Sequence, residues 1–391
     1  MRWWRVVGLL SGTSMDGIDV VAAEMALDGE AILLRPLGDT TLDYPADLRE
    51  QLRDALPPGD VDAATLCRLD THVGQAFADA ARLGVELAGG EADFIASLGQ
   101  TLYHWVEGDR ALGTLQIGQP SWIAEATGLP VISDLRTRDV AASGHGAPLA
   151  GVLDALWLGG AETQVAVNIG GIANITVVGG PEPLAYDTGP GNALIDLAAH
   201  QRTGRAQDTD GALAASGTPD EDLLKLLLDE PYYALPAPKS TGKEHFNAAH
   251  LDRALTELGR PIDDGDLLAT LTELTAATVA DACRAEGAHR VVVSGGGVHN
   301  PVLLAALRRR LDVPVLVSND LGMPADSKEA LLTALLGFLT WHGLPGNTPG
   351  TTGAAGPRIL GSITPGRTAL RLPEPATTPP RRLIVRSAAT N

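Results

Sequence analysis

The sequence has few cysteines, few aromatic residues, a shortage of basic side chains and no long apolar run. Its two cysteines, Cys67 and Cys283, are far apart and neither stands in a C-x-x-C pair, which excludes a disulfide framework and a cysteine-based zinc site. The 29 basic against 48 acidic residues give a formal charge of −19. Because nucleic acid and anionic membranes select basic proteins, we expect neither as a partner.

Targeting signals and several catalytic motifs are also missing. The apolar run after the basic N-terminus stops at Leu10, which is too short for a signal peptide. The longest strongly apolar stretch, about 331–341, is below the roughly 18 residues that a membrane span needs. No H-E-x-x-H or G-x-S-x-G motif occurs, which disfavours zinc and serine hydrolases. We therefore predict a soluble cytoplasmic protein.

Apolar periodicity predicts an α/β protein of two to three domains, at about 150 residues per domain. We expect strands over 3–10, 19–27 and 31–37, helices over 46–56 and 62–87, strands over 94–98 and 114–117, a helix over 121–127 and a strand over 130–133. The opening pattern recurs as strands over 163–169, 174–178 and 183–186 and a helix over 192–200. This recurrence predicts a duplicated fold.

The rest of the chain alternates helices with strands. Helices are expected over 264–286, 301–311 and 329–339, and strands over 290–293 and 314–317, which indicates a parallel component. After His342 the composition turns to glycine, proline and threonine, with arginines near a proline-rich end. We expect about the last fifteen residues to be mobile.

Three glycine-rich segments have the composition of anion-binding turns. Residues 12–19 join two strands with small residues and hydroxyls that suit a phosphate, although a plain hairpin turn is the alternative. Residues 168–174 take the equivalent place in the second half. Residues 294–300 lie between a strand and a helix with Asn300 as N-cap and Pro301 at its first position. This loop does not match G-x-G-x-x-G, no G-x-x-x-x-G-K-[ST] motif occurs, and a tight turn remains its alternative.

Polar segments near the middle carry the other candidate residues. Asp187 precedes a helix, where backbone N–H groups favour the ionised carboxylate and a role as general base, with helix capping as the alternative. The stretch 239–247 has two lysines and hydroxyls that suit a carboxylate or a sugar, or form a solvated loop. The loop 143–149, preceded by Arg136, Arg138 and Asp139, has a similar character.

Together these residues resemble the anhydro-N-acetylmuramic acid kinase family, within the superfamily of sugar kinases, actin and heat-shock-chaperone ATPases. The resemblance runs from about Val7 to Gly366. It rests on six segments in the family's order: 10–19, 168–174, 187–192, 239–247, 294–300 and 326–329. It implies an actin-like (ribonuclease H-like) ATPase fold, in which duplicated β-β-β-α-β-α units form two lobes around a nucleotide cleft. We expect the first lobe over 1–135, the second over 136–345, a segment packing back on the lobes over 346–370 and a mobile tail over 371–391.

The resemblance also implies a reaction. Family members convert 1,6-anhydro-N-acetylmuramic acid, ATP and water to N-acetylmuramic acid 6-phosphate and ADP during peptidoglycan recycling. Asp187 would deprotonate the water that attacks the anomeric carbon, while the oxygen released at carbon 6 attacks the γ-phosphoryl group. Glu329 would support catalysis. We also expect Mg²⁺ to bind the phosphates, with no protein ligands assigned to it. The family further implies a homodimer.

The binding residues implied by the resemblance fall into two groups. Those expected to hold ATP are Gly12, Thr13, Ser14, Met15, Asp16, Gly17, Ile18, Asp19, Gly170, Gly171, Asn174, Gly295, Gly296 and Gly297. Those expected to contact the amino sugar are Ser97, Gln100, Arg136, Lys239, Ser240, Thr241 and Asn247.

Two positions depart from the family pattern. Leu98 stands where the family commonly has histidine, and Leu135 where it often has phenylalanine, and either change affects the expected sugar pocket. The remaining alternatives are a kinase of the same fold acting on another sugar, an actin-like or chaperone-like ATPase that needs no sugar, and a non-catalytic relative.

Overall fold

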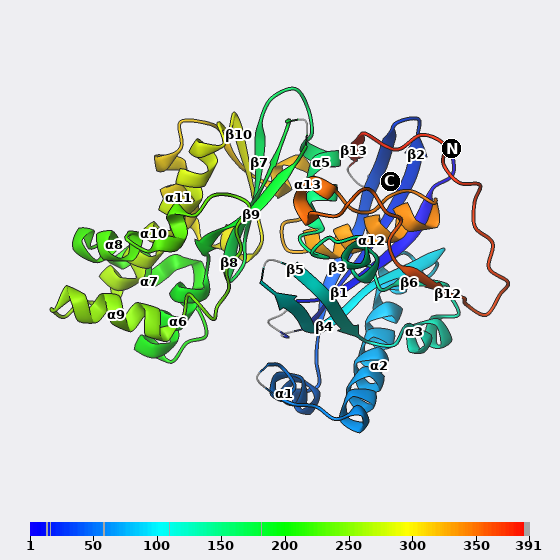
Figure 1. The fold of residues 1–391 in the computed structure, drawn as a ribbon, viewed down its shortest axis with the longest axis horizontal. Helices are drawn as coiled ribbons and strands as arrows, with labels where there is room; N and C mark the ends of the chain where they lie inside the picture. Colours follow the sequence, from blue (N-terminus) through cyan, green and yellow to red (C-terminus); the bar gives the residue numbers. More distant parts are fainter. Residues whose placement is uncertain (13–14, 16, 58, 109, 181, 387–391) are drawn as a thin grey trace. The chain divides into compact units, whose positions relative to one another are not determined.

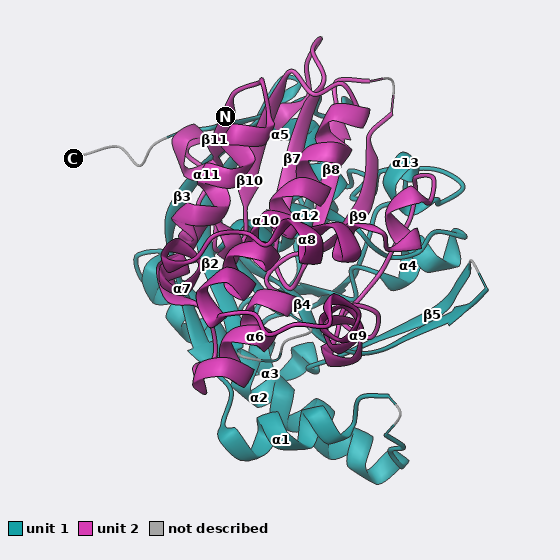
Figure 2. Ribbon diagram, turned by 90° about the vertical axis from the view of Figure 1, so that its left-hand side faces the viewer, with its two compact units in different colours: residues 1–157, 327–391 teal, residues 158–326 magenta. Residues whose placement is uncertain are grey.

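The chain forms an α/β protein of two compact units. The computed structural model describes all residues except 13–14, 16, 58, 109, 181 and 387–391 (Figure 1). Unit 1 comprises residues 1–157 and 327–391, and unit 2 comprises residues 158–326 (Figure 2). Among the described residues, no helix is both long and apolar enough to cross a membrane.

The described residues of unit 1 form an eight-stranded mixed sheet in the order β12-β6-β4-β1-β2-β3-β13, with β5 paired to β4. Its strands are β1 (Trp4–Ser11), β2 (Gly17–Asp28), β3 (Ala31–Asp43), β4 (Phe94–Glu107), β5 (Arg110–Ile117), β6 (Val131–Ser133), β12 (Ser362–Thr364) and β13 (Arg382–Val385). Its helices are α1 (Ala46–Asp54), α2 (Ala63–Leu87), α3 (Pro120–Thr127), α4 (Thr137–Ala141), α5 (Ala150–Leu158), whose last residue falls in unit 2, α12 (Lys328–Trp341) and α13 (Pro349–Thr352).

Two helices cover opposite faces of this sheet. Successive side chains of a strand point to opposite faces. Val7 accordingly faces α2, where a Cβ on Gly84 would collide with the Val7 methyl groups. The next residue, Gly8, lies against α12, where a Cβ would collide with the backbone of Ala330. The absence of a side chain at Gly8 and Gly84 therefore allows α12 and α2 to approach the central strand closely.

The described residues of unit 2 form a five-stranded sheet in the order β11-β10-β7-β8-β9. Its strands are β7 (Gln164–Ile169), β8 (Ile172–Val178), β9 (Leu184–Pro190), β10 (Arg290–Ser294) and β11 (Val315–Val317). Its helical segments are α6 (Ala193–Thr203), η1 (Thr209–Gly211), α7 (Ala212–Ser216), α8 (Glu221–Leu228), η2 (Pro231–Ala234), α9 (Ala248–Leu258), α10 (Asp264–Ala285), η3 (Gly296–His299), α11 (Pro301–Arg310) and η4 (Ser318–Leu321). Alternate residues of β7, namely Val165, Val167 and Ile169, are fully buried in a core shared with α10 and α11.

The two sheets have the same topology, which confirms the predicted duplication. The order β3-β2-β1-β4-β6 in unit 1 corresponds to β9-β8-β7-β10-β11 in unit 2. In both, the first three strands form an antiparallel meander, and the fourth and fifth strands add in parallel beside the first. The shared order and directions are those of the predicted actin-like ATPase fold.

The unit boundaries differ from the predicted lobes. Residues 136–157 and 327–345 were expected in the second lobe but belong to unit 1. The physical reason is packing, because α12 lies on β1 and its Trp341 ring stacks on Phe94 of β4 at 4.6 Å between centroids. The segment 346–370 also belongs to unit 1, where β12 pairs with β6.

Part of the tail, expected to be mobile over 371–391, forms a paired strand, and residues 387–391 of that range lie outside the described residues. Residues 382–385 form β13, which pairs in parallel with β3, and the Leu383 side chain is buried. Backbone N–H groups of Arg381 and Arg386 donate to the carbonyl oxygens of Glu30 and Leu34, both at 2.8 Å. The sequence offers no local signal for this strand because its partner comes from the start of the chain.

Candidate active site

The connection between β1 and β2 in unit 1 contains the first predicted phosphate turn. Thr13, Ser14 and Asp16 of this turn lie outside the described residues. The Ser11 hydroxyl donates to the Gly17 carbonyl at 2.8 Å, and the Gln100 amide donates to the Gly12 carbonyl at 3.2 Å. The two strands are antiparallel, as in the hairpin alternative, but residues 12–16 make the connection longer than a two-residue turn. Ile18 is fully buried in the core, so its side chain supports the turn from inside the protein.

Gln100, which was expected to contact the sugar, also helps to position this turn. The Gln100 side chain is fully buried and accepts a hydrogen bond from the Tyr44 hydroxyl at 3.3 Å. Burial raises the pKa of Tyr44, so its hydroxyl stays protonated and able to donate. Asp19, on β2, accepts a hydrogen bond from the Thr41 hydroxyl at 2.8 Å.

A cavity of about 480 Å³ in unit 1 contains part of the predicted sugar site. Its volume lies in the range typical of small-molecule sites. Ser97, Leu98 and Asp134 are among its lining residues. The Ser97 hydroxyl is buried and has no hydrogen-bond partner within the described part of the chain, so it can donate to a ligand in this cavity. Leu98 gives the wall an apolar patch at the position where the family commonly has histidine.

Arg136 and Glu329, which are far apart in the sequence, interact electrostatically in unit 1. Burial lowers the pKa of the Arg136 guanidinium, while the nearby carboxylates of Glu329 and Asp139 raise it. The guanidinium donates to the Gly146 carbonyl at 2.7 Å, and its Nε atom has no partner among the residues described. Arg136 remains charged under all ordinary conditions, so it presents a fixed positive charge beside Glu329.

Asp139 holds the Arg136 loop in place. Its fully buried carboxylate accepts hydrogen bonds from Gly146 N at 2.8 Å, Asn347 Nδ2 at 2.7 Å and Thr352 Oγ1 at 2.8 Å. These contacts join the loop after α4 to the segment around α13. From the sequence, Asp139 is recognisable only as a neighbour of Arg136, because its partners Asn347 and Thr352 are far away along the chain.

Three glycine-containing segments of unit 2, namely 168–174, 187–192 and 294–300, meet at one end of its sheet. The carbonyl of Gly170 accepts a hydrogen bond from Asn192 N at 2.8 Å. The Gly171 carbonyl accepts from Gly191 N at 2.9 Å. A Cβ on Gly295 would collide with the Asn168 side chain, so the 294–300 loop also lies against the 168–174 turn. The structure therefore places Gly170, Gly171 and Gly295–Gly297 close to one another.

The helix after the 294–300 loop begins as predicted. Asn300 is the N-cap of α11, and its Oδ1 atom accepts hydrogen bonds from Val302 N and Leu303 N, both at 3.0 Å. Pro301 occupies the first helical turn. These hydrogen bonds hold the last residue of the 294–300 loop in place at the start of α11.

Asp187 lies on β9, beside Asn174 of β8, and is held by the 239–247 loop. Its Oδ2 atom accepts hydrogen bonds from Ser240 Oγ at 2.9 Å and Thr241 N at 3.0 Å. The backbone of Asp187 is held as well, because its N–H donates to the Lys239 carbonyl at 3.0 Å and its carbonyl accepts from the Tyr232 hydroxyl at 2.7 Å. The carboxylate is therefore fixed in one orientation by neighbours from two segments.

The direction of the pKa shift of Asp187 differs from the expectation. Helix α6 begins at Ala193 with Asn192 as N-cap, so helical N–H groups do not cap Asp187. Burial raises the pKa of the Asp187 carboxyl above its ordinary value. The hydrogen bonds from Thr241 and Ser240 lower it by less, and the Glu244 carboxylate raises it further. A raised pKa makes the ionised form a stronger base at neutral pH.

Lys239 and Asn247, at the two ends of this loop, have partners in η2 and α9. The Lys239 ammonium donates to the carbonyls of Tyr232 at 3.2 Å and Tyr233 at 2.8 Å, and burial lowers its pKa. Asn247 is the N-cap of α9, where its Oδ1 atom accepts from His250 N at 3.2 Å. Both residues therefore shape the loop that carries Ser240 and Thr241.

Two further residues near the second glycine turn were not selected from the sequence. The Lys243 side chain lies on Gly171, where a Cβ would collide with it, and so brings a positive charge to this turn. Burial raises the pKa of Asp196 to about 6, although Lys243 lowers it and Asp208 raises it. Lys243 lies inside the recognised 239–247 segment, whereas Asp196 carries no sequence signal because its burial depends on the fold.

The duplicated sheet topology and the glycine turns at its strand ends define the class of sugar kinases and actin-like ATPases. The family model described as "Anhydro-N-acetylmuramic acid kinase" matches residues 4–366. The chain belongs to this family.

Curated relatives agree with the family assignment. The protein named anhydro-N-acetylmuramic acid kinase from Streptomyces coelicolor is 56% identical over 388 residues, covering 97% of this chain and 99% of the relative. The protein of the same name from Rhodococcus erythropolis is 52% identical over 375 residues, covering 93% of this chain and 94% of the relative. Among solved structures, the activator of the 2-hydroxyisocaproyl-CoA dehydratase from Clostridium difficile with bound ADPNP gives a TM-score of 0.44 at 14% identity, covering 85% of this chain and 94% of the activator. At this level the resemblance says nothing further about the chain.

Proposed function

We propose that the protein is an ATP-dependent kinase that hydrolytically opens 1,6-anhydro-N-acetylmuramic acid and phosphorylates it to N-acetylmuramic acid 6-phosphate in peptidoglycan recycling. The family match over residues 4–366 carries this proposal. Water adds its hydroxyl to the anomeric carbon, the bond from that carbon to the bridging oxygen breaks, and the freed oxygen at carbon 6 attacks the γ-phosphoryl group. ADP is the other product, and the proton taken from the water is released to solvent, so atoms and charges balance.

Asp187 acts as the general base in this proposal. The carboxylate takes the proton of the attacking water, and its raised pKa suits that role. Ser240 and Thr241 position the carboxylate by the hydrogen bonds to Oδ2 and are positioning residues. A glycosidase needs a second carboxyl group as acid, whereas here phosphoryl transfer captures the departing oxygen.

In unit 1, we propose that the sugar is contacted by residues lining the 480 Å³ cavity and by the Arg136 guanidinium. Ser97 offers an unpartnered hydroxyl to the cavity. Arg136 offers a positive charge that suits the carboxylate of the muramic acid lactyl group. Glu329 supports Arg136 electrostatically. Lys239 and Asn247 act through the loop they hold, and Gln100 through the first glycine turn.

The nucleotide contacts are proposed to come from the glycine turns. Residues Gly12–Asp19 of unit 1 and Gly170, Gly171 and Asn174 of unit 2 would contact phosphates through backbone N–H groups. Lys243 adds a positive charge at Gly171. Gly295–Gly297 would border the adenosine, where the lack of side chains allows a close approach.

We also propose Mg²⁺ as the metal of the bound nucleotide. Asp19 sits on β2 next to the first glycine turn, and carboxylate oxygens are the protein ligands that Mg²⁺ prefers. This donor type fits the ion, which would neutralise charge on the phosphate oxygens. Most of its remaining ligands would be phosphate oxygens and water.

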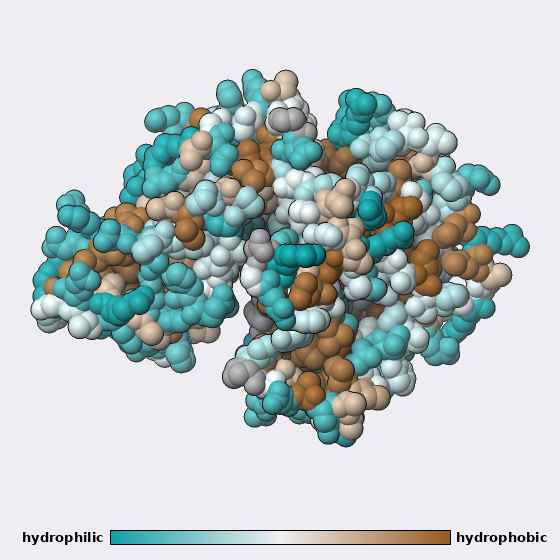
Figure 3. Space-filling model, viewed as in Figure 1, coloured by the Kyte–Doolittle hydropathy of each residue, from teal (hydrophilic) through white to brown (hydrophobic). Residues whose placement is uncertain are grey.

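A homodimer and a cytoplasmic location complete the proposal. The β4–β5 hairpin exposes large apolar side chains, among them Trp105 and Leu112, and Figure 3 shows hydrophobic residues on the surface in this part of unit 1. Such exposure is typical of an interaction surface. Light scattering during gel filtration tests the dimer. The proposed co-substrate ATP is made in the cytoplasm, and cell fractionation tests that location.

A coupled ADP-release assay tests the reaction. Purified protein receives ATP, Mg²⁺ and 1,6-anhydro-N-acetylmuramic acid, with a control that lacks the sugar and another that offers free hexoses. We expect ADP release only with the anhydro sugar. Replacement of Asp187 by asparagine removes a positioned base, which is typically worth about 10²- to 10⁴-fold in rate. Release with a free hexose instead would favour a kinase for another sugar, and release without any sugar would favour a sugar-independent ATPase.

A further inference from the structure

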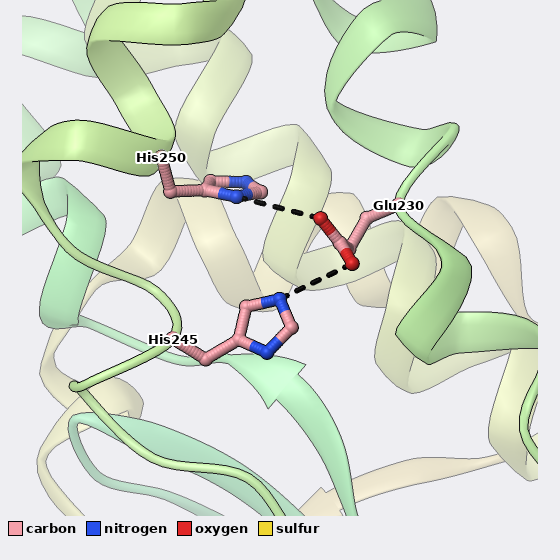
Figure 4. Close-up of side chains that lie close together, drawn as sticks. All are labelled: Glu230, His245 and His250. Carbon is pink, nitrogen blue, oxygen red and sulfur yellow. Dashed lines mark ion pairs between the residues drawn. The ribbon is translucent and has the colours of Figure 1, made fainter.

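Two histidines and one glutamate converge in unit 2, outside the residues assigned to the reaction (Figure 4). Glu230 precedes η2, His245 lies in the 239–247 loop, and His250 lies in the first turn of α9. His245 Nε2 is 3.1 Å from Glu230 Oε1, and His250 Nδ1 is 3.6 Å from Glu230 Oε2. One ligand atom from each residue lies within 4.8 Å of the other two.

We propose that Glu230, His245 and His250 form a binding site for a divalent transition-metal ion of the Zn²⁺ class. Two imidazoles and one carboxylate are an established ligand set for Zn²⁺. In a tetrahedral site with bonds of about 2.1 Å, neighbouring ligand atoms lie about 3.4 Å apart. The two histidine-to-glutamate distances are close to that spacing, although each histidine nitrogen faces a different oxygen of the Glu230 carboxylate. His245 lies in a loop, whose adjustment would bring the three ligand atoms to this spacing.

The surroundings supply a buried ligand and an open coordination position. The His250 side chain is only 6% exposed, so an ion bound to it would be largely shielded from solvent. The Nε2 atom of His250 is buried and has no hydrogen-bond partner among the described residues. One of its two ring nitrogens is therefore left without a hydrogen bond. His245 is 37% exposed, which leaves a route for the ion and room for a water ligand.

One charged neighbour competes with the ion. Arg253 Nη2 lies 3.3 Å from His250 Nδ1. Arg253 is exposed and one turn further along α9, so its side chain can rotate into solvent when the ion binds. The negative charge of Glu230 favours the cation. The site is therefore expected to bind more tightly when Arg253 is replaced by leucine.

The site joins the two segments that hold Asp187. Glu230 lies two positions before Tyr232, whose hydroxyl donates to the Asp187 carbonyl. His245 belongs to the loop whose Ser240 and Thr241 donate to the Asp187 carboxylate. A bound ion would cross-link these segments, so we expect it to raise the melting temperature, since an ion that binds only the native state stabilises it.

Metal titration of the full-length, tag-free protein tests the proposal. After chelator treatment and dialysis, ZnCl₂ is titrated by calorimetry in excess Mg²⁺, and Co²⁺ is added separately while absorption is recorded. We expect one Zn²⁺ per chain and the visible absorption bands of tetrahedral Co²⁺. Melting curves with and without Zn²⁺ give a second readout that does not involve kinase activity.

Matched variants locate the ion. His245→Phe keeps an aromatic ring stacked on Phe246, where the centroids are 4.6 Å apart, but removes the ligand atom. Glu230→Gln keeps shape and removes charge. Each should weaken Zn²⁺ binding at least about tenfold, since even outer-sphere changes typically cost 10- to 100-fold. The control His72→Phe replaces an exposed histidine on α2 and should bind like the wild type. Absence of one-to-one binding in the wild type, or unchanged binding by His245→Phe, would overturn the proposal, whether or not the kinase reaction is confirmed.

Discussion

At the scale of single residues, the strength of Asp187 as a base depends on opposing effects of its neighbours. Burial raises its pKa, whereas the donors Ser240 and Thr241 lower it while fixing its orientation. The sequence identified the residue and the loop. It could not give the sign of the pKa change, because burial comes from the packing of the 231–241 segment along β9 rather than from the adjacent helix.

Replacement of Ser240 by alanine is expected to move the acid limb of the pH–rate profile to higher pH. The ionised base is the active form, so activity falls as pH drops through the pKa of Asp187. Loss of a donor to the carboxylate raises that pKa further, so the loss of kcat/KM is larger at acidic than at alkaline pH. The control Ser216→Ala, an exposed serine of unit 2, should leave the profile unchanged. An acid limb that stays in place would show that another group controls it.

Asp196 is expected to destabilise the folded protein at neutral and alkaline pH. Its pKa is about 6 in the fold against 3.8 in the unfolded chain, so the native state binds more protons between these values. The contribution of Asp196 to stability is therefore favourable at low pH and is lost as pH rises through about 6. Asp196→Asn should raise the free energy of unfolding at pH 8 by about 1 kcal/mol, after allowance for its partial exposure. The difference should vanish near pH 4, and an increase at pH 4 as large as at pH 8 would contradict this assignment.

At the scale of elements, the long periodic segments could be predicted from the sequence. The predicted helix over 62–87 is observed as Ala63–Leu87, and the predicted helix over 264–286 as Asp264–Ala285. Their apolar faces are buried, so a local pattern reports them. Short elements such as α4 and β13 were missed, because contacts with distant segments determine them.

The Arg136 loop illustrates such long-range dependence, and Asp139→Ala should disrupt it. The change leaves the buried donors of Gly146, Asn347 and Thr352 without their acceptor, and an unsatisfied buried group costs about 1–3 kcal/mol. We expect the free energy of unfolding to drop by about 3 kcal/mol or more in urea denaturation, and KM for the sugar to rise because Arg136 loses its support.

A matched control separates this effect from simple loss of charge. Asp79→Ala removes an exposed aspartate whose partner is Arg82, and should change the free energy of unfolding by less than about 0.5 kcal/mol. Equal effects of the two substitutions would contradict the role given to Asp139.

At the scale of the whole molecule, the duplicated sheet places corresponding glycine turns at corresponding strand connections. The resemblance of six segments was sufficient to predict this fold and the family. The unit boundary was not predictable, because it depends on long-range contacts with the first part of the chain. Helix α12 packs on β1, β12 pairs with β6, and β13 pairs with β3.

Removal of β13 tests how much the pairing of β13 with β3 contributes to the stability of the protein. A chain that ends at Arg381 loses the buried Leu383 side chain and the ladder with β3, and also leaves β3 as an exposed edge. We expect a free energy of unfolding lower by about 2 kcal/mol, with kinase activity retained at low temperature. A chain that ends at Arg386 keeps β13 and should melt like the full chain. Equal melting temperatures for all three chains would show that β13 adds no stability.

The central claim is that ring opening by water and phosphoryl transfer occur in one reaction, and oxygen labelling tests it most directly. The protein is incubated with ATP, Mg²⁺ and 1,6-anhydro-N-acetylmuramic acid in ¹⁸O-water, and the products are analysed rapidly by mass spectrometry. The account predicts N-acetylmuramic acid 6-phosphate with one ¹⁸O on the sugar and none in its phosphoryl group. Label in released inorganic phosphate, with the anhydro sugar left unchanged, would contradict it.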